Sequence, residues 1–375
     1  MRSFIVDKDH LIAVMNEVCM DSRFERFTVK EDFYGQRLFD VDCKDMSLNR
    51  IADRDDFNAI RSDFMMGVDT MHHSECPGHE HLRSALHSSL VLPPENLDEV
   101  VDRINESITK SRKRLGFTGQ RAVSIDSNLA YKRLLSRLLL ERGRFGITED
   151  NPKDLMVTLS KVSIREISSA SNSKLDRRRN PGALRRALPG RCFADHLANR
   201  PTLRAVSALN ALAEHASIRD AFTYYEVDEG MPEVFDSEKA DEYIVRELVG
   251  HFRKGQMDQT FLTADDSMSS LLYGERMDHI VVRYPKEVPR SLTATPWLVR
   301  ELLYDLSLSF RCIRIDGTGV SIMGVWDGKT STDFIDEKVC VAISDGSRIG
   351  EHLERDFRIL RRMRESELID LDRVK

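Results

Sequence analysis

Several features that would place a protein outside the cell or in a membrane are missing from this sequence of 375 residues. Its six cysteines are scattered and include no Cys-x-x-Cys pair, which indicates reduced thiols, mostly in the core, of a cytoplasmic protein. No apolar run approaches the roughly 18 residues that a membrane span requires. Asp7, Lys8 and Asp9 interrupt the segment where a signal peptide needs an unbroken apolar stretch. We therefore expect a cytoplasmic protein that makes no contact with membranes.

An excess of positive charge is also missing. The formal net charge is −6 at pH 7, so the whole molecule is not a polycation that would coat nucleic acid indiscriminately. Apolar residues make up 41% of the chain and charged residues 31%, which is typical of a globular protein with sizeable cores. A chain of this length has room for two or three domains.

The sequence predicts three regions along the chain. Residues 1–118 are expected to be a mostly helical N-terminal region, because apolar residues recur with helical spacing in 97–108. Residues 119–288 alternate short apolar runs with helical patterns, which is typical of an α/β domain. Its parallel sheet would carry helices on both faces. Residues 289–375 combine β-rich runs, Gly/Asp turns and a charged final helix, which predicts a small α+β C-terminal appendage.

Four short runs in the central region are its predicted strands: RAVSID (121–126), LMVTLS (155–160), TFLTAD (260–265) and HIVVRYP (279–285). The first and third of these runs end on carboxylates, Asp126 and Asp265. Because the carboxyl ends of parallel strands line one edge of a sheet, both side chains should reach the same crevice. A cluster of like charges is costly unless a cation neutralises it. Oxygen ligands without Cys or His favour Mg²⁺ or Mn²⁺.

Two further acids lie in predicted helices near this edge. Glu166 follows the second strand by one or two helical turns, and Asp241 begins DEYIVRELVGHF, whose apolar residues have helical spacing. Four acids thus come from four separate segments. Other acids compete for the last two positions: Asp236, Glu238 and Glu247 with Asp241, and Asp266 with Asp265.

In this order the four segments resemble the motifs of PIN-domain nucleases. SIDSNLAYKRLL resembles the first motif, in which an Asp ends a strand and an Asn follows two residues on. VTLSKVSIREIS resembles the second strand and the helix that bears the family's acid, and DEYIVREL resembles the third acidic motif. FLTADDSM resembles the fourth, with Thr263 two residues before Asp265. The resemblance covers roughly 120–285, and it departs from the family pattern in two long connections, on either side of Asp241.

The resemblance implies a PIN-like fold and a divalent-metal-dependent ribonuclease that cleaves RNA phosphodiester bonds. The large regions on either side of the central one favour a role in RNA processing or quality control over that of a minimal toxin. Divalent ions held by carboxylates can activate a water molecule and stabilise charge on the scissile phosphate. The catalytic metal ligands that it implies, for Mg²⁺ or Mn²⁺, are Asp126, Glu166, Asp241 and Asp265. Asn128 and Thr263 would orient a carboxylate or a water molecule.

One insertion within the central region is strongly basic. Residues 174–204 carry nine Lys and Arg against two Asp, a net charge of +7 inside an acidic protein. Arginine forks suit phosphate oxygens, and a local basic stripe is the electrostatic signature of nucleic-acid binding. Phe193 is its single aromatic residue, so base stacking is not expected to read sequence here. We expect RNA contacts from Arg177, Arg178, Arg179, Arg185 and Arg186, the alternative being a solvated loop.

A histidine-rich segment, MHHSECPGHEH, forms a second candidate site. Cys76 and His79 have the C-x-x-H spacing of zinc ligands, although no second pair completes a four-ligand pattern. The residues that would contribute are His72, His73, Cys76, His79 and His81. The segment is either a zinc site or a polar loop.

Two other functions are compatible with these residues. A PIN-fold protein could bind RNA or a protein partner without cutting, although the presence of all four acids favours activity. A phosphohydrolase of the haloacid dehalogenase type could use Asp126 as its nucleophile, but it needs a second Asp where Asn128 stands. Beyond RNA, we expect any protein partner to bind through the N-terminal or C-terminal region.

Overall fold

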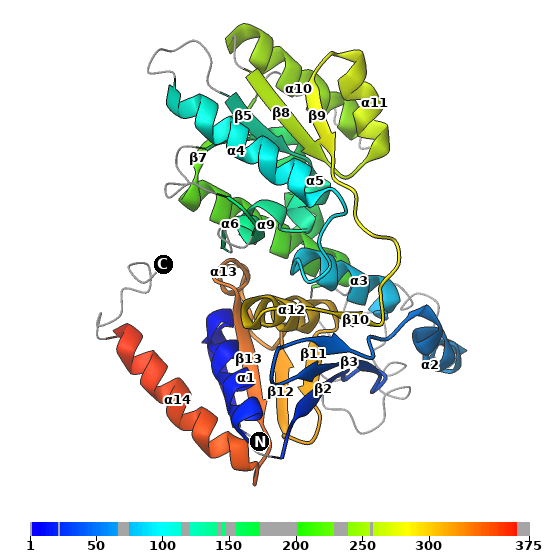
Figure 1. The fold of residues 1–375 in the computed structure, drawn as a ribbon, viewed down its shortest axis with the longest axis vertical. Coiled ribbons are helices and arrows are strands. Elements are labelled where there is room, and N and C mark those ends of the chain that lie inside the picture. Colours follow the sequence, from blue (N-terminus) through cyan, green and yellow to red (C-terminus); the bar gives the residue numbers. More distant parts are fainter. Residues whose placement is uncertain are drawn as a thin grey trace. The chain divides into compact units, whose positions relative to one another are not determined.

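The computed structural model describes residues 2–21, 23–66, 75–113, 121–140, 145–147, 155–172, 201–228, 239–255 and 258–365. The chain divides into two compact units (Figure 1). Unit 1 comprises Met1–Val91, Lys174–Leu203 and Glu287–Lys375, and unit 2 comprises Leu92–Ser173 and Arg204–Lys286. Each unit is built around a sheet of its own.

The sheet of unit 2 has five strands, all parallel, in the order β7-β6-β5-β8-β9. The strands are β5 (Arg121–Ile125), β6 (Met156–Ser160), β7 (Thr223–Val227), β8 (Asp258–Thr263) and β9 (Asp278–Val281). Four of them are the strands that the sequence predicts, so the prediction of an α/β parallel sheet is confirmed. β7 is not among the predicted strands, because this edge strand buries only Val227 fully and has no apolar run.

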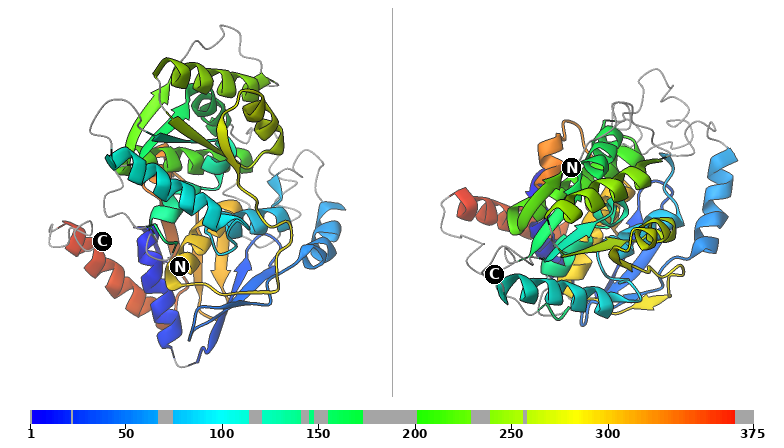
Figure 2. Two further views of the ribbon diagram at one scale, coloured as in Figure 1. Left: turned by 45° about the horizontal axis from the view of Figure 1, so that its top comes forward. Right: turned by 90° about the horizontal axis from the view of Figure 1, so that it is seen from above.

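Helices cover the faces of this sheet, and Figure 2 shows its strands between α10 and α4. They are α4 (Leu97–Lys113), α5 (Ser127–Tyr131), α6 (Leu134–Leu140), α7 (Lys161–Ser171), α9 (Leu203–Ala221), α10 (Ala240–Gly255) and α11 (Asp266–Gly274). The apolar stripe of α10 packs on Ala122 and Phe261 of the sheet. That stripe consists of residues whose spacing predicts the helix: Ile244, Leu248 and Phe252.

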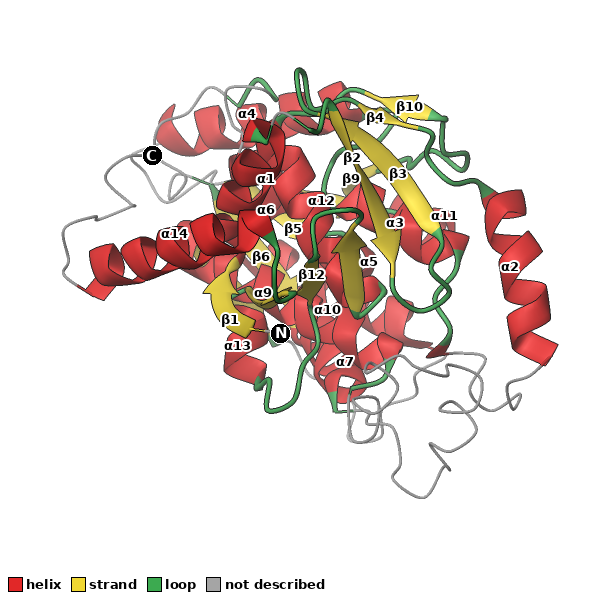
Figure 3. Ribbon diagram, turned by 90° about the horizontal axis from the view of Figure 1, so that it is seen from below, coloured by secondary structure: helices red, strands yellow, loops and turns green. Residues whose placement is uncertain are grey.

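Unit 1 contains an antiparallel sheet of eight strands in the order β1-β13-β12-β11-β2-β3-β4-β10. The N-terminal part of the chain supplies β1 (Arg2–Asp7), β2 (Arg26–Glu31), β3 (Arg37–Asp42) and β4 (Leu48–Asn49). The C-terminal part supplies β10 (Ser291–Leu292), β11 (Cys312–Ile315), β12 (Val320–Met323) and β13 (Lys338–Ile343). Figure 3 shows the long hairpin strands β2 and β3 beside each other.

The helical elements of unit 1 are η1 (Lys8–His10), α1 (Leu11–Met20), α2 (Arg54–Met66), α3 (His79–Ser88), α12 (Pro296–Ser309), α13 (Ser331–Ile335) and α14 (Arg348–Glu365). The most deeply buried of the helices whose side chains are described is α12, in which every residue from Leu298 to Leu308 is buried. Thr295 caps its N-terminus by accepting a hydrogen bond from the backbone N–H of Leu298, and Pro296 occupies the first helical position.

This sheet joins the regions predicted at the two ends of the chain. The two ends of the chain form one sheet instead of a helical region and a separate appendage, since β1 pairs with β13 and β2 with β11. β2, β3 and β4 also pair with one another locally, but β1, β2 and β4 each have a partner near the far end of the chain, namely β13, β11 and β10. Local periodicity carries no information about such pairing. The β-rich runs and the final charged helix predicted after 289 are present as β11, β12, β13 and α14.

Two expectations concern the cysteines and membranes. Cys76, Cys312 and Cys340 are buried, Cys19 and Cys43 are partly buried, and all five are free thiols. Cys192 lies outside the described residues. Among the helices that the structure describes, none has both the length and the apolar character that crossing a bilayer demands.

Candidate active site at the edge of the parallel sheet

Three neighbouring strands of unit 2 end together with oxygen-bearing side chains. The parallel register places Ser124 opposite Thr158 and Ile125 opposite Leu262, so β5, β6 and β8 reach the same edge. Asp126 follows β5, Ser160 ends β6 and Thr263 ends β8. Strand ends in a parallel sheet are the usual position of binding and catalytic sites.

Asp126 lies at the centre of this edge and is only 1% exposed. Its Oδ2 accepts hydrogen bonds from Thr263 Oγ1 at 3.0 Å and from Asn128 Nδ2 at 3.1 Å, and its Oδ1 accepts one from Ser127 Oγ at 3.2 Å. Burial raises the pKa of the Asp126 carboxyl, and these hydrogen bonds oppose that rise. Both residues predicted to orient a carboxylate therefore contact the same one.

Asp265 is connected to Asp126 through Thr263. The backbone N–H of Asp265 donates to Thr263 Oγ1 at 3.0 Å, while that hydroxyl donates to Asp126. The Asp265 carboxylate caps α11, because its Oδ1 accepts from the backbone N–H and the hydroxyl of Ser267, both at 2.7 Å. The T-x-D spacing thus holds both acids at one position of the edge. Asp266, the competing acid, is exposed in the first turn of α11.

Glu166 and Asp241 complete the set of acids. Glu166 is partly buried in α7, six residues beyond the end of β6, and Asp241 is partly buried in the first turn of α10. Burial raises the pKa of Asp241, and the carboxylates of Asp126, Asp265 and Glu166 raise it further. The structure therefore brings all four predicted acids within electrostatic range of one another. We call this site the acidic edge.

Ser160, which the sequence did not mark as a site residue, contacts Glu247, the acid that competes with Asp241 for the third position. Ser160 caps α7 by accepting from the backbone N–H of Val162 at 3.0 Å, and its hydroxyl donates to Glu247 of α10. Both side chains are buried. One feature of the sequence could have indicated Ser160: it ends its apolar run, as Asp126 ends the preceding run. Glu247 is hydrogen-bonded to Ser160, whereas the pKa of Asp241 is raised by burial and by the other three acids. Asp241 is therefore the better candidate for the third position.

The donor atoms of the acidic edge are of the kind that binds a hard cation, but its side chains do not converge on one point. Its donors are carboxylate and hydroxyl oxygens, which Mg²⁺ and Mn²⁺ prefer. Among the described residues, no three His, Cys, Asp or Glu side chains converge closely enough to form one metal-binding group. Mg²⁺ commonly keeps several waters and binds one or two carboxylates directly. The edge therefore fits a partly water-bridged ion better than an all-protein cage.

The remaining predicted residues fall into two groups. The five arginines of the basic insertion, together with Asp236, Glu238, His72 and His73, lie outside the described residues. Cys76 is buried, the pKa of His79 is lowered by burial, and the His81 ring accepts from the backbone N–H of Gly78 at 3.1 Å. These three belong to no metal-binding group in the part of the chain that the structure describes.

Comparisons with known proteins place the chain in no family. No protein-family model matches it, and no curated protein matches it. One similar solved structure is a domain of a functionally unknown protein from Methanocaldococcus jannaschii DSM 2661. It has 12% sequence identity and a TM-score of 0.29, over 45% of this chain and 95% of that chain. The structure itself defines a mixed α/β protein that combines a parallel and an antiparallel sheet.

Proposed function

We propose that this protein is a divalent-metal-dependent ribonuclease of the PIN-like type, which hydrolyses RNA phosphodiester bonds at the acidic edge. The observation that carries the proposal is geometric: the Thr263 hydroxyl contacts both the buried Asp126 carboxylate and the backbone N–H of Asp265 at the shared strand edge. The pKa of Asp241, raised by burial and then by the carboxylates of Asp126, Asp265 and Glu166, agrees with this arrangement. Like charges held together near a buried carboxylate destabilise the folded protein unless a cation neutralises them. Groups perturbed in this way by burial and by neighbouring charge are concentrated at functional sites.

Each residue of the acidic edge has a defined task in this proposal. The four carboxylates would hold Mg²⁺ or Mn²⁺ directly or through water. A bound ion would supply an activated water and charge stabilisation at the phosphate. Thr263 and Asn128 fix the orientation of the Asp126 carboxylate through their hydrogen bonds to Oδ2. The basic insertion, with Arg177 to Arg179, Arg185 and Arg186, would bind the RNA backbone.

The burial of Asp126 argues against the phosphohydrolase alternative. A nucleophilic carboxylate must reach a phosphorus atom, whereas Asp126 is 1% exposed and has both oxygens engaged by hydrogen bonds. Asn128, at the position where that mechanism needs a second acid, donates to Asp126 instead of acting as an acid. A buried carboxylate oriented by its neighbours is better suited to hold a cation than to attack.

The Asp126→Asn variant tests the proposal, because it keeps the shape of the side chain and removes its charge. Mg²⁺ or Mn²⁺ should support cleavage of single-stranded or loop RNA by the wild type, and EDTA should stop it. We expect Asp126→Asn to slow cleavage by at least about 100-fold while leaving RNA binding intact. Labelled RNA resolved on denaturing gels gives the rate.

Asp266→Asn is the matched control, since it removes an exposed carboxylate from the first turn of α11, at the same edge of the sheet, and should leave the rate unchanged. Wild-type activity in Asp126→Asn would show that Asp126 is no metal ligand. If the wild type binds many RNAs in the presence of metal but cuts none, the protein is the non-cutting RNA-binding alternative.

A further inference from the structure

The last described helix, α14, has one apolar face and one basic face. Ile349, Leu353 and Phe357 are buried at a spacing of four residues, and the Phe357 ring lies 5.7 Å from the ring of Phe4 in β1. This stripe anchors the helix to unit 1. The exposed residues of α14 include five arginines, at positions 348, 355, 358, 361 and 362.

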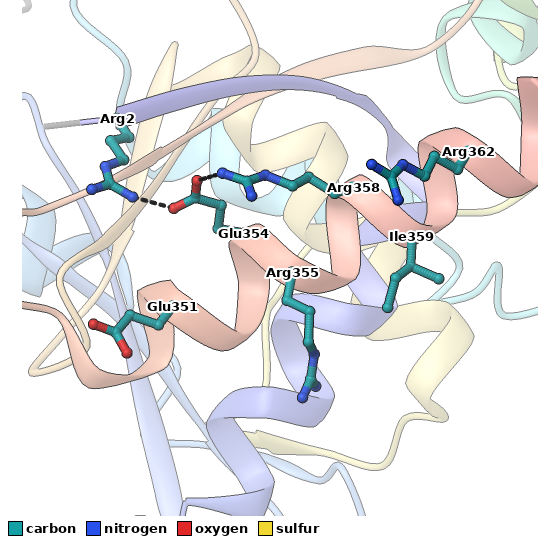
Figure 4. Close-up of a pocket in the computed structure, with 7 residues that line it drawn as sticks. All are labelled: Arg2, Glu351, Glu354, Arg355, Arg358, Ile359 and Arg362. Atoms are coloured by element: carbon teal, nitrogen blue, oxygen red, sulfur yellow. Dashed lines mark hydrogen bonds and ion pairs between the residues drawn. The ribbon is translucent and has the colours of Figure 1, made fainter.

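A hollow of about 480 Å³ lies along this exposed face (Figure 4). Its lining consists of Arg2 from β1 and six residues of α14: Glu351, Glu354, Arg355, Arg358, Ile359 and Arg362. Four arginines thus face two glutamates in a protein whose overall charge is negative. We call this hollow the α14 groove.

One of the two glutamates of the α14 groove is already paired with arginines. Glu354 accepts hydrogen bonds from Arg2 and from Arg358, and Figure 4 shows both guanidinium groups directed at its carboxylate. Each of those two bonds uses one of the five N–H donors that an arginine carries. The remaining donors leave both guanidinium groups able to bind a second anion.

Two more arginines extend the positive surface along the helix. Arg362 is exposed and forms no ion pair within the described part of the chain. Arg355, which is exposed, pairs with its neighbour in sequence, the partly buried Asp356, at 2.9 Å, and an ion pair at the surface contributes little. At about 1.5 Å of rise per residue, Arg355, Arg358 and Arg362 span about 10 Å. A row of this kind can contact an extended polyanion at several points.

We propose that the α14 groove binds the phosphate backbone of single-stranded RNA. Arginine forks bind phosphate oxygens in a bidentate manner, and their charge is not lost at any physiological pH. Ile359, which is 47% exposed beside Arg355, offers an apolar contact to a ribose or a base. The proposal deepens the ribonuclease function, on which it rests for the choice of RNA over an acidic peptide. It assigns unit 1 a share in substrate binding.

The test measures binding in EDTA, where no cleavage is expected. A labelled single-stranded RNA oligonucleotide is titrated with the full chain, and its anisotropy is followed at several KCl concentrations. Replacing Arg355, Arg358 and Arg362 by Gln should raise the Kd at least tenfold. It should also reduce the salt slope of log K by about 2, because three phosphate contacts at about 0.7 counterions each are lost.

A second variant and a matched control accompany the triple variant. Arg362→Glu reverses an exposed charge without disturbing the bonds to Glu354, so it should weaken RNA binding even if the triple variant unfolds. The control replaces three exposed arginines outside the groove by Gln, namely Arg26, Arg276 and Arg283. It removes the same charge and should change Kd less than twofold.

The possible outcomes separate this inference from the proposed function. Unchanged affinity and salt slope in both groove variants would overturn the inference. The inference would also be overturned if the groove variants weakened binding of a polyglutamate peptide but left RNA binding unchanged. The groove would then be a site for an acidic peptide. Failure of the ribonuclease proposal has a different signature, namely no metal-dependent cleavage despite RNA binding that the groove variants weaken.

Discussion

Asp241 shows how the acidic edge affects stability at the scale of a single residue. Its pKa is raised above the ordinary value by burial and by three neighbouring carboxylates. Between the unfolded and the folded pKa, the folded state binds more protons than the unfolded state. The free energy of unfolding therefore falls as pH rises through that interval, and the full penalty is present above the folded pKa.

Replacing Asp241 by Asn should remove this penalty. Without metal at pH 7, we expect the free energy of unfolding to rise by a few tenths to about 1 kcal/mol, since the half-exposed site is screened by solvent. Mg²⁺ should stabilise the wild type more than the variant, because the variant loses a ligand charge. Urea unfolding with EDTA or Mg²⁺ measures both effects. Glu242→Gln, an exposed neighbour on the same helix, is the control, and equal stabilisation of all three proteins by Mg²⁺ would contradict the assignment.

His215 is a buried residue of α9 that the candidate site does not use. Burial lowers its pKa to about 4, Arg219 contributes in the same direction, and the ring Nε2 has no hydrogen-bond partner among the described residues. An unfolded histidine titrates near pH 6.5. Between about pH 6.5 and 4 the unfolded chain thus binds a proton that the folded chain does not. The stability associated with neutral His215 is full above pH 6.5 and is lost as the pH falls.

His215→Phe should flatten this pH dependence. Between pH 7 and pH 5 the wild type should lose up to about 2 kcal/mol more free energy of unfolding than the variant. Urea unfolding at the two pH values measures the difference. His352→Gln removes a histidine whose side chain is 58% exposed, and it should behave as the wild type does. Parallel pH curves for His215→Phe and the wild type would show that His215 is protonated freely in the folded protein.

At the scale of secondary structure, Asp265, the N-cap residue of α11, has two tasks. Asp265 caps the helix through Ser267, and its carboxylate also belongs to the acidic edge. A negative side chain at a helix N-terminus is stabilised by the free backbone N–H groups and the helix dipole. The capping contribution and the charge can be separated, because Asn caps about as well as Asp.

Asp265→Asn and Asp265→Ala should therefore differ in stability but not in activity. We expect Asp265→Asn to keep the free energy of unfolding close to that of the wild type, and Asp265→Ala to lower it by about 1 kcal/mol. Both variants should lose metal-dependent cleavage, since both remove the carboxylate. Urea unfolding and the gel assay give the two quantities, and wild-type cleavage by Asp265→Asn would exclude Asp265 as a metal ligand.

At the scale of the whole molecule, the two units differ in how far apart their pairing segments lie in the sequence. The sheet of unit 2 forms from strands within 121–281, joined by helices. The sheet of unit 1 needs β1 beside β13 and β2 beside β11, so both ends of the chain must be present before it is complete. Contacts between segments so distant in sequence cost loop-closure entropy before they stabilise the fold. We therefore expect unit 1 to be the slower of the two to form.

The sequence by itself determined those features that arise from local patterns. Apolar runs predicted β5, β6, β8 and β9, and helical spacing predicted α4 and α10. The positions of Asp126 and Asp265 after their strands followed from the same runs. Because parallel strands share one edge, the approach of these acids to each other could also be inferred, and the structure places both next to Thr263.

Only the tertiary structure decided what depends on residues far apart in the chain. It joined both termini in one antiparallel sheet, placed β7 at the edge of the other sheet, and paired Ser160 with Glu247. It also placed Arg2 against α14, so that a groove forms where the sequence shows only a charged helix. Each of these contacts is made by side chains or strands that fold together across long separations. Their burial and hydrogen bonding, rather than any local periodicity, select the partner.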